Sequence, residues 1–153
     1  MAKTLAARLG LPHVELDAFH HGPNWAEPTA EEFRAGVGEA IAGEGWVVDG
    51  NYGTKLRDTV VSRAELIVWL DLPLRSVLRR LWRRTVHRMR DDVELWSGNR
   101  ETWRGAFLSR DSLFLWVLKT HRRRKREMSA LECVRLRSAA EADAWLEGFA
   151  PGR

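Results

Sequence analysis

The chain has 153 residues, of which 44% are apolar and 30% are charged, and its formal net charge is +4 at pH 7. This length suits a single domain with a sizeable core, and the composition is typical of a folded soluble protein. No apolar run is long enough to cross a membrane, and the start of the chain lacks the pattern of a signal peptide. Because Cys133 is the only cysteine, no internal disulfide is possible, and we expect a cytoplasmic protein.

Helices and strands alternate in the first half of the chain. Helices are expected at residues 1–10 and 29–43, and strands at residues 12–17 and 45–49. Gly10 supplies the left-handed residue that commonly ends a helix, and Thr29 with Glu32 forms a capping box that opens the next one. The two strands end on Asp17 and Asp49.

The second half continues this alternation. It is expected to contain a strand at 66–71, a helix at 74–90, a long helix from about 100 to 127, a strand near 133–137 and a last helix from 138 to 149. The first of these strands contains the apolar run LIVWL, which is typical of a strand covered by helices on both faces. Ser138 and Glu141 form a second capping box. Strands that alternate with helices predict an α/β fold with a doubly wound parallel sheet.

The helix at 74–90 combines an apolar stripe with a high density of arginine. Its predicted packing stripe is Val77, Leu78, Leu81, Trp82, Thr85, Val86 and Met89, and the arginines are Arg75, Arg79, Arg80, Arg83, Arg84, Arg88 and Arg90. Guanidinium groups bind phosphate in a bidentate fork, so this density favours anion binding, with a solvated basic face as the alternative. Together with the basic segment at 119–126, the segment at 75–90 indicates a polyanionic partner: a nucleotide, a nucleic acid or an acidic protein.

Three predicted strands end on an aspartate: Asp17, Asp49 and Asp71. Ligands of parallel α/β sheets bind beyond the carboxyl ends of the strands, so these carboxylates and the arginine helix suit a magnesium-bound nucleotide. The structural alternative is equally simple, because Asp commonly ends strands and caps helices. His20 and His21 follow Asp17 without partners at zinc-type spacing, which favours a polar loop role over metal ligation.

Four stretches together resemble one known family. They are LGLPHVELDAFHHGPNW, GWVVDGNY, LDLP before the arginine helix, and ELWSGNRE, within residues 5 to about 146. They resemble the adenylate-kinase-like P-loop proteins called DNA topology modulation proteins. The resemblance implies a nucleoside-monophosphate-kinase type of fold with a five-stranded parallel sheet. It also implies ATP and Mg²⁺ as ligands and phosphoryl transfer to a nucleotide or another small-molecule acceptor.

The resemblance also implies roles for individual residues. Asp49 would bind Mg²⁺ through water, and Asp17, with His20 and His21, would line the acceptor side. A lid-like helical region at about 75–127 would supply the catalytic arginines Arg80, Arg84 and Arg88. The cofactor would also be contacted by Asn51, Arg100 and Arg137.

The chain departs from the family at its beginning. Family members open with an apolar strand and a loop of pattern G-x-x-x-x-G-K-[ST], and neither is present here. Lys3 lies too close to Gly10 to begin the helix that follows such a loop, so we expect it inside the first helix. Without the central first strand the sheet would become two half-sheets with unpaired edges, which is costly. We therefore expect an N-terminally truncated single domain over residues 1–153, lacking roughly 15–20 natural residues.

A chain without the P-loop is expected to be inactive as a kinase. The alternative to truncation is a degenerate relative that rearranged its sheet. Two other functions remain open: a nucleic-acid-binding protein that influences DNA topology through residues 75–90 and 119–126, and a non-catalytic, pseudokinase-like protein. The identity of the phosphoacceptor does not follow from these residues.

Overall fold

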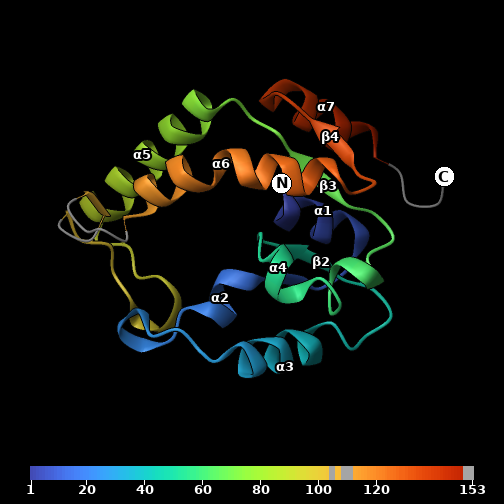
Figure 1. Ribbon diagram of the computed structural model, residues 1–153, viewed down its shortest axis with the longest axis horizontal. Coiled ribbons are helices and arrows are strands. Elements are labelled where there is room, and N and C mark those ends of the chain that lie inside the picture. The colour runs from blue at the N-terminus through green and yellow to red at the C-terminus, as the bar shows by residue number, and fades with distance from the viewer. Residues whose placement is uncertain (104–105, 108–111, 150–153) are drawn as a thin grey trace. The chain divides into compact units, whose positions relative to one another are not determined.

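The computed structural model describes residues 1–103, 106–107 and 112–149 of a mixed α/β protein (Figure 1). The chain divides into two compact units. Unit 1 comprises Met1–Glu65 and the segment from Asp143 onward, and unit 2 comprises Leu66–Ala142. None of the helices in the described part has the length and apolar character needed to cross a bilayer. The prediction of one domain over residues 1–153 stays a prediction.

Unit 1 alternates helices with two short strands, as the sequence predicts. Its elements are α1 (Ala2–Leu9), β1 (His13–Glu15), α2 (Leu16–His20), α3 (Ala30–Ala40), β2 (Val47–Asp49) and α4 (Gly53–Leu56), with single 3₁₀ turns at Pro23–Trp25 and Val61–Arg63. Gly10 ends α1 with a φ of 65°, the left-handed conformation expected of it. Lys3 lies inside α1, as predicted. The capping box is also confirmed: Glu32 N donates to Thr29 Oγ1, and Thr29 N donates to Glu32 Oε2.

Several boundaries in unit 1 differ from the prediction, including the start of β2, which is Val47 rather than residue 45. The first strand ends at Glu15 rather than at Asp17, because the chain turns directly into the short helix α2 and Asp17 lies in its first turn. Helix α3 ends at Ala40, three residues before the predicted Gly43.

The two strands of unit 1 pair in parallel, with His13 opposite Val47 and Glu15 opposite Asp49. One buried cluster supports them, formed by residues of β1, α2, α3, its C-cap and α4. Its members are Val14, Leu16, Phe33, Val37, Ile41 and Leu56. Because β1 and β2 are parallel, the segments that follow them leave the sheet at the same edge.

Unit 2 repeats the parallel arrangement with two longer helices. Its elements are β3 (Val68–Leu70), α5 (Leu74–Arg90), a 3₁₀ turn at Trp96–Gly98, α6 (Leu113–Ser129) and β4 (Val134–Leu136), and α7 (Ala139–Gly148) follows. Strand β3 pairs with β4, with Trp69 opposite Arg135. Helices α5 and α6 lie side by side within this unit (Figure 1).

The long helix predicted from about residue 100 begins later. Residues 99–102 are not helical, and α6 begins at Leu113, where the Ser112 hydroxyl accepts a 3.3 Å hydrogen bond from Leu115 N. The parts of that prediction at 104–105 and 108–111 lie outside the described residues. The predicted cap of the last helix is present, since Glu141 N donates to Ser138 Oγ at 3.1 Å. Its reciprocal bond goes from the backbone of Arg137, and not of Ser138, to the Glu141 carboxylate.

The parallel α/β class is confirmed, but the described residues form two separate two-stranded sheets in place of one doubly wound sheet. The apolar run around β3 is also incompletely covered by the described residues. Leu66 and Leu70 are 43% and 42% exposed, so the prediction of a strand covered on both faces is wrong.

Candidate functional site

The strand ends of unit 1 are joined by a hydrogen bond between side chains. Tyr52 Oη donates to Asp17 Oδ1 at 2.6 Å, and both side chains are partly buried. Asp17 reaches this position because β1 passes directly into α2, and Tyr52 because it comes three residues after β2 ends. The bond fixes the direction of the Asp17 carboxylate and leaves Oδ2 available for a ligand.

A group of aromatic rings surrounds this bond. His20 is buried, and its ring centroid lies 4.7 Å from that of Tyr52 and 5.2 Å from that of Phe33. Burial lowers the pKa of His20, outweighing the attraction of the Glu27 carboxylate 3.5 Å from Nε2. The imidazole is therefore neutral at pH 7, and it acts as an aromatic wall of the site. Its Nδ1 has no hydrogen-bond partner among the described residues.

Asp49 ends β2 at the same edge of the sheet. Its carboxylate is 59% exposed, and Oδ2 lies 3.9 Å from Nε2 of His13, a nitrogen buried on the neighbouring strand β1. Asn51 follows in the exposed loop before α4. Unit 1 thus places Asp17, Asp49 and Asn51 at or just after the carboxyl ends of paired parallel strands, the edge at which α/β proteins bind ligands.

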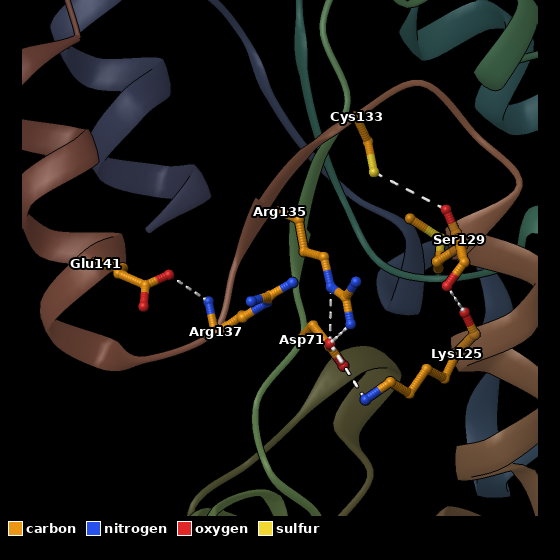
Figure 2. A network of polar contacts seen from close by, with 8 residues as sticks. Asp71, Lys125, Ser129, Cys133, Arg135, Arg137 and Glu141 are labelled. Carbon is orange, nitrogen blue, oxygen red and sulfur yellow. Dashed lines mark hydrogen bonds and ion pairs between the residues drawn. The ribbon is translucent and has the colours of Figure 1, made fainter.

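Asp71 belongs to the sheet of unit 2, and there it makes structural contacts (Figure 2). Its side chain is only 7% exposed, accepts a 2.9 Å hydrogen bond from Arg135 Nε, and lies 3.4 Å from Lys125 Nζ. Burial alone would raise the pKa of Asp71, but the hydrogen bonds and charges of Arg135 and Lys125 outweigh it and lower the pKa. The carboxylate therefore links β3, β4 and α6.

The predicted lid arginines all lie on α5, in different surroundings. Arg80 and Arg84 are exposed. Arg88 is largely buried: its Nη1 lies 3.0 Å from Oε1 of Glu101, and the two side chains are 19% and 13% exposed. Its guanidinium also lies over the ring of Trp96, 5.7 Å from the centroid. Arg88 thus forms a stabilising ion pair with Glu101.

The remaining predicted cofactor residues are placed by unit 2. Arg100 is paired with the carboxylate of Asp92 and lies 3.7 Å from that of Glu94. Arg137 directly follows β4, and its backbone N–H donates to Glu141 at 2.7 Å while its side chain is exposed (Figure 2).

Most of these partners were not singled out from the sequence, although Lys125 belongs to the predicted basic segment at 119–126. Tyr52, Glu101, Lys125 and Arg135 each contact a predicted site residue. Tyr52 had a usable signal, because it lies three residues beyond a strand-ending aspartate in the segment DGNY. The pairing of Asp71 with Arg135 had no signal in the sequence, because it depends on the register of β3 and β4.

No group of three or more His, Cys, Asp or Glu residues within the described ranges could hold a metal ion. Asp49 alone still fits Mg²⁺, which often keeps most of its water shell and takes one or two carboxylates besides substrate phosphates. No known protein family, curated protein or solved structure matches this chain.

Proposed function

We propose that this chain provides the acceptor-binding and phosphate-neutralising parts of a MgATP-dependent phosphotransferase that acts on a nucleotide or another small molecule. One observation carries the proposal: Asp49 ends β2, Asp17 lies two residues beyond the end of the parallel strand β1, and Tyr52 hydrogen-bonds to Asp17. Parallel α/β proteins bind their ligands at this edge, and phosphoryl transfer relies on positioning and electrostatics.

Asp17 is the residue suited to the acceptor. A carboxylate held by one hydrogen bond can accept a second from a substrate hydroxyl and take its proton as the phosphoryl group arrives. Tyr52, the partner of Asp17, begins a series of ring contacts that continues through His20 and His21 to Trp25, and such rings suit a planar base or a sugar ring.

Asp49 is the residue suited to the metal. An exposed carboxylate at a strand end would hold the water shell of Mg²⁺, which would supply charge stabilisation for the transferring phosphate. In unit 2, Arg80 and Arg84 are exposed arginines of the kind that neutralises phosphate charge, whereas Arg88 would first have to leave Glu101. The glycine-rich loop that holds ATP in P-loop proteins has no counterpart in this sequence.

The test is a gain of activity. An extended chain carries an apolar strand and a G-x-x-x-x-G-K-T loop in front of Met1, and phosphoryl transfer from MgATP to a panel of nucleoside monophosphates is measured with both chains. We expect transfer only by the extended chain. In it, Asp17→Asn should lower kcat by about 100-fold or more, the usual contribution of a general base. Asp58→Asn, a change of an exposed carboxylate in the same unit, is the matched control.

Two outcomes would contradict the proposal. One is an extended chain that melts cooperatively and transfers no phosphate, which would favour a non-catalytic, pseudokinase-like protein. The other is equal activity of the Asp17 and Asp58 variants. Arg84→Ala in the active chain should also sharply reduce turnover, and unchanged turnover would remove the lid role of this arginine.

A further inference from the structure

The proposed function leaves one surface of α5 unexplained. Arg75, Arg79, Arg83 and Arg90 are spaced by four, four and seven residues, so they form one row along the helix, opposite the buried Leu81 and Thr85. All four are exposed, and within the described residues none of them makes a hydrogen bond or an ion pair. The predicted lid arginines lie on a different stripe. Among the described residues, the row is therefore a line of positive charge without ion-pair partners.

The length of this row exceeds what one nucleotide can contact. Arg75 and Arg90 are separated by 15 residues of helix, or about 22 Å at roughly 1.5 Å per residue. A fully stacked nucleic-acid strand advances about 3.4 Å per nucleotide, as in a duplex, so the row spans at most about six nucleotides. Guanidinium groups bind phosphate in two-pronged hydrogen bonds, which makes a phosphodiester backbone the complementary ligand.

An exposed tryptophan lies beside the row. Trp82 was expected to pack in the core stripe, but it is 50% exposed, with Phe107 on one side at a centroid distance of 5.0 Å. It lines an open groove of about 450 Å³. The other residues of the groove are Arg83, Val86, His87, Arg90 and Asp91. Asp91 is the single acidic residue that lines the groove, and its Oδ2 lies 2.7 Å from Nδ1 of His87.

We propose that this groove and the arginine row bind single-stranded nucleic acid, with phosphates on Arg79, Arg83 and Arg90 and a base stacked on Trp82. An aromatic plane next to cations that follow a backbone is the arrangement by which proteins bind single strands without reading their sequence. A duplex hides the faces of its bases from such a ring. A lipid surface would require a broader apolar face than Trp82 and Val86 provide.

The first experiment measures binding of a labelled oligothymidine of about twelve nucleotides, twice the span of the row, by anisotropy. Buffers contain EDTA and no ATP, so the result does not depend on the proposed phosphotransferase function. The variant is Arg83→Ala/Arg90→Ala, and the control is Lys3→Ala/Arg57→Ala, which removes two exposed charges from unit 1. Both change the formal net charge from +4 to +2.

We expect the groove variant to weaken binding and to reduce the slope of log K against log[salt] by about 1.4, since each lost phosphate contact removes about 0.7. The control should keep the slope of the unaltered protein. Equal losses in both variants would mean attraction by net charge alone and would overturn the proposal, as would no binding by the unaltered protein.

The second experiment tests the stacked base. Trp82→Ala should weaken binding about 5- to 150-fold, the range that corresponds to a lost stacking contact. Trp82→Phe keeps packing against Phe107 and should lose less, so it separates stacking from a folding defect. Binding to a duplex as tight as to the single strand, or binding to anionic vesicles with none to the oligonucleotide, would overturn the proposal.

Discussion

Tyr52 and Asp17 are 35 residues apart in the chain, and a 2.6 Å hydrogen bond joins their side chains. The bond ties the loop after β2 to helix α2, which follows β1, at the edge where both strands end. It turns two short segments into one rigid edge of unit 1. The candidate site of this unit is built on that edge.

Removal of the hydroxyl should weaken this edge without disturbing the core. Tyr52→Phe is expected to lower the free energy of unfolding by about 1 kcal/mol, the usual net value of a partly buried hydrogen bond. Urea denaturation followed by circular dichroism measures it. Ser129→Ala, which removes an exposed hydrogen bond to Lys125 O, is the control and should lose less. An unchanged midpoint for the Tyr52 variant would mean that the bond does not contribute.

His20 should make the protein less stable in mild acid. Burial lowers the pKa of folded His20 below its ordinary value of 6.5. As the pH falls through that value, the unfolded chain therefore takes up a proton that the folded chain resists. The loss of folding stability is absent well above pH 6.5. It grows as the pH falls from 6.5 toward the folded pKa, by at most about 1.4 kcal/mol per pH unit for one proton.

The replacement His20→Phe fills the same aromatic position and removes this titration. Urea unfolding at pH 7.5 and pH 5.5 should show a smaller loss of stability in this variant than in the unaltered protein. His121→Gln is the control for a histidine outside the cluster. The same pH dependence with and without His20 would assign the acid sensitivity to other groups.

Asp71 should have the opposite pH dependence. Its folded pKa is lowered from the ordinary value of 3.8, so its contribution to stability is complete above that value. The contribution is lost as the pH falls through the folded pKa. Asp71→Asn should cost about 2 kcal/mol near neutral pH, because Arg135 and Lys125 lose a buried partner. It should also flatten the decline in stability below about pH 4. A variant with the acid sensitivity of the unaltered protein would contradict this role.

Two arginines of the predicted lid should differ in their effect on stability. Arg88→Ala leaves Glu101 largely buried without its cation and is expected to cost about 3 kcal/mol, whereas Arg80→Ala should stay within about 0.5 kcal/mol. Thermal unfolding at one protein concentration compares them. Equal melting temperatures would show that the Arg88–Glu101 pair adds nothing to stability.

Local signals in the sequence predicted most elements. Gly10 ends a helix because its left-handed conformation costs glycine little, and Thr29 with Glu32 begins one because the two satisfy each other's backbone amides. Such signals act over three or four residues, so they are visible in the chain itself. Boundaries that depend on packing were less accurate, as at Asp17, where a strand was expected to continue and a helix begins.

Burial was the property most poorly predicted. The run around β3 and Trp82 on α5 both read as core, yet Leu70 and Trp82 are 42% and 50% exposed. An apolar pattern states which residues would be buried if a partner element covered them. It does not state whether that element is present. Each sheet has only two strands, and the neighbouring described elements cover Leu70 and Trp82 incompletely.

The sequence by itself determined the order of helices and strands, their parallel α/β class, and the placement of Asp17, Asp49 and Asp71 near strand ends. These properties follow from periodicity and short-range capping. Only the tertiary structure decided which of these side chains lie at the open edge of a sheet and which are bound within the fold. Asp17 is held by Tyr52, Asp71 by Arg135 and Lys125, and Arg88 by Glu101. Each pairing depends on strand register and helix packing, which bring distant residues together and leave no local pattern in the chain.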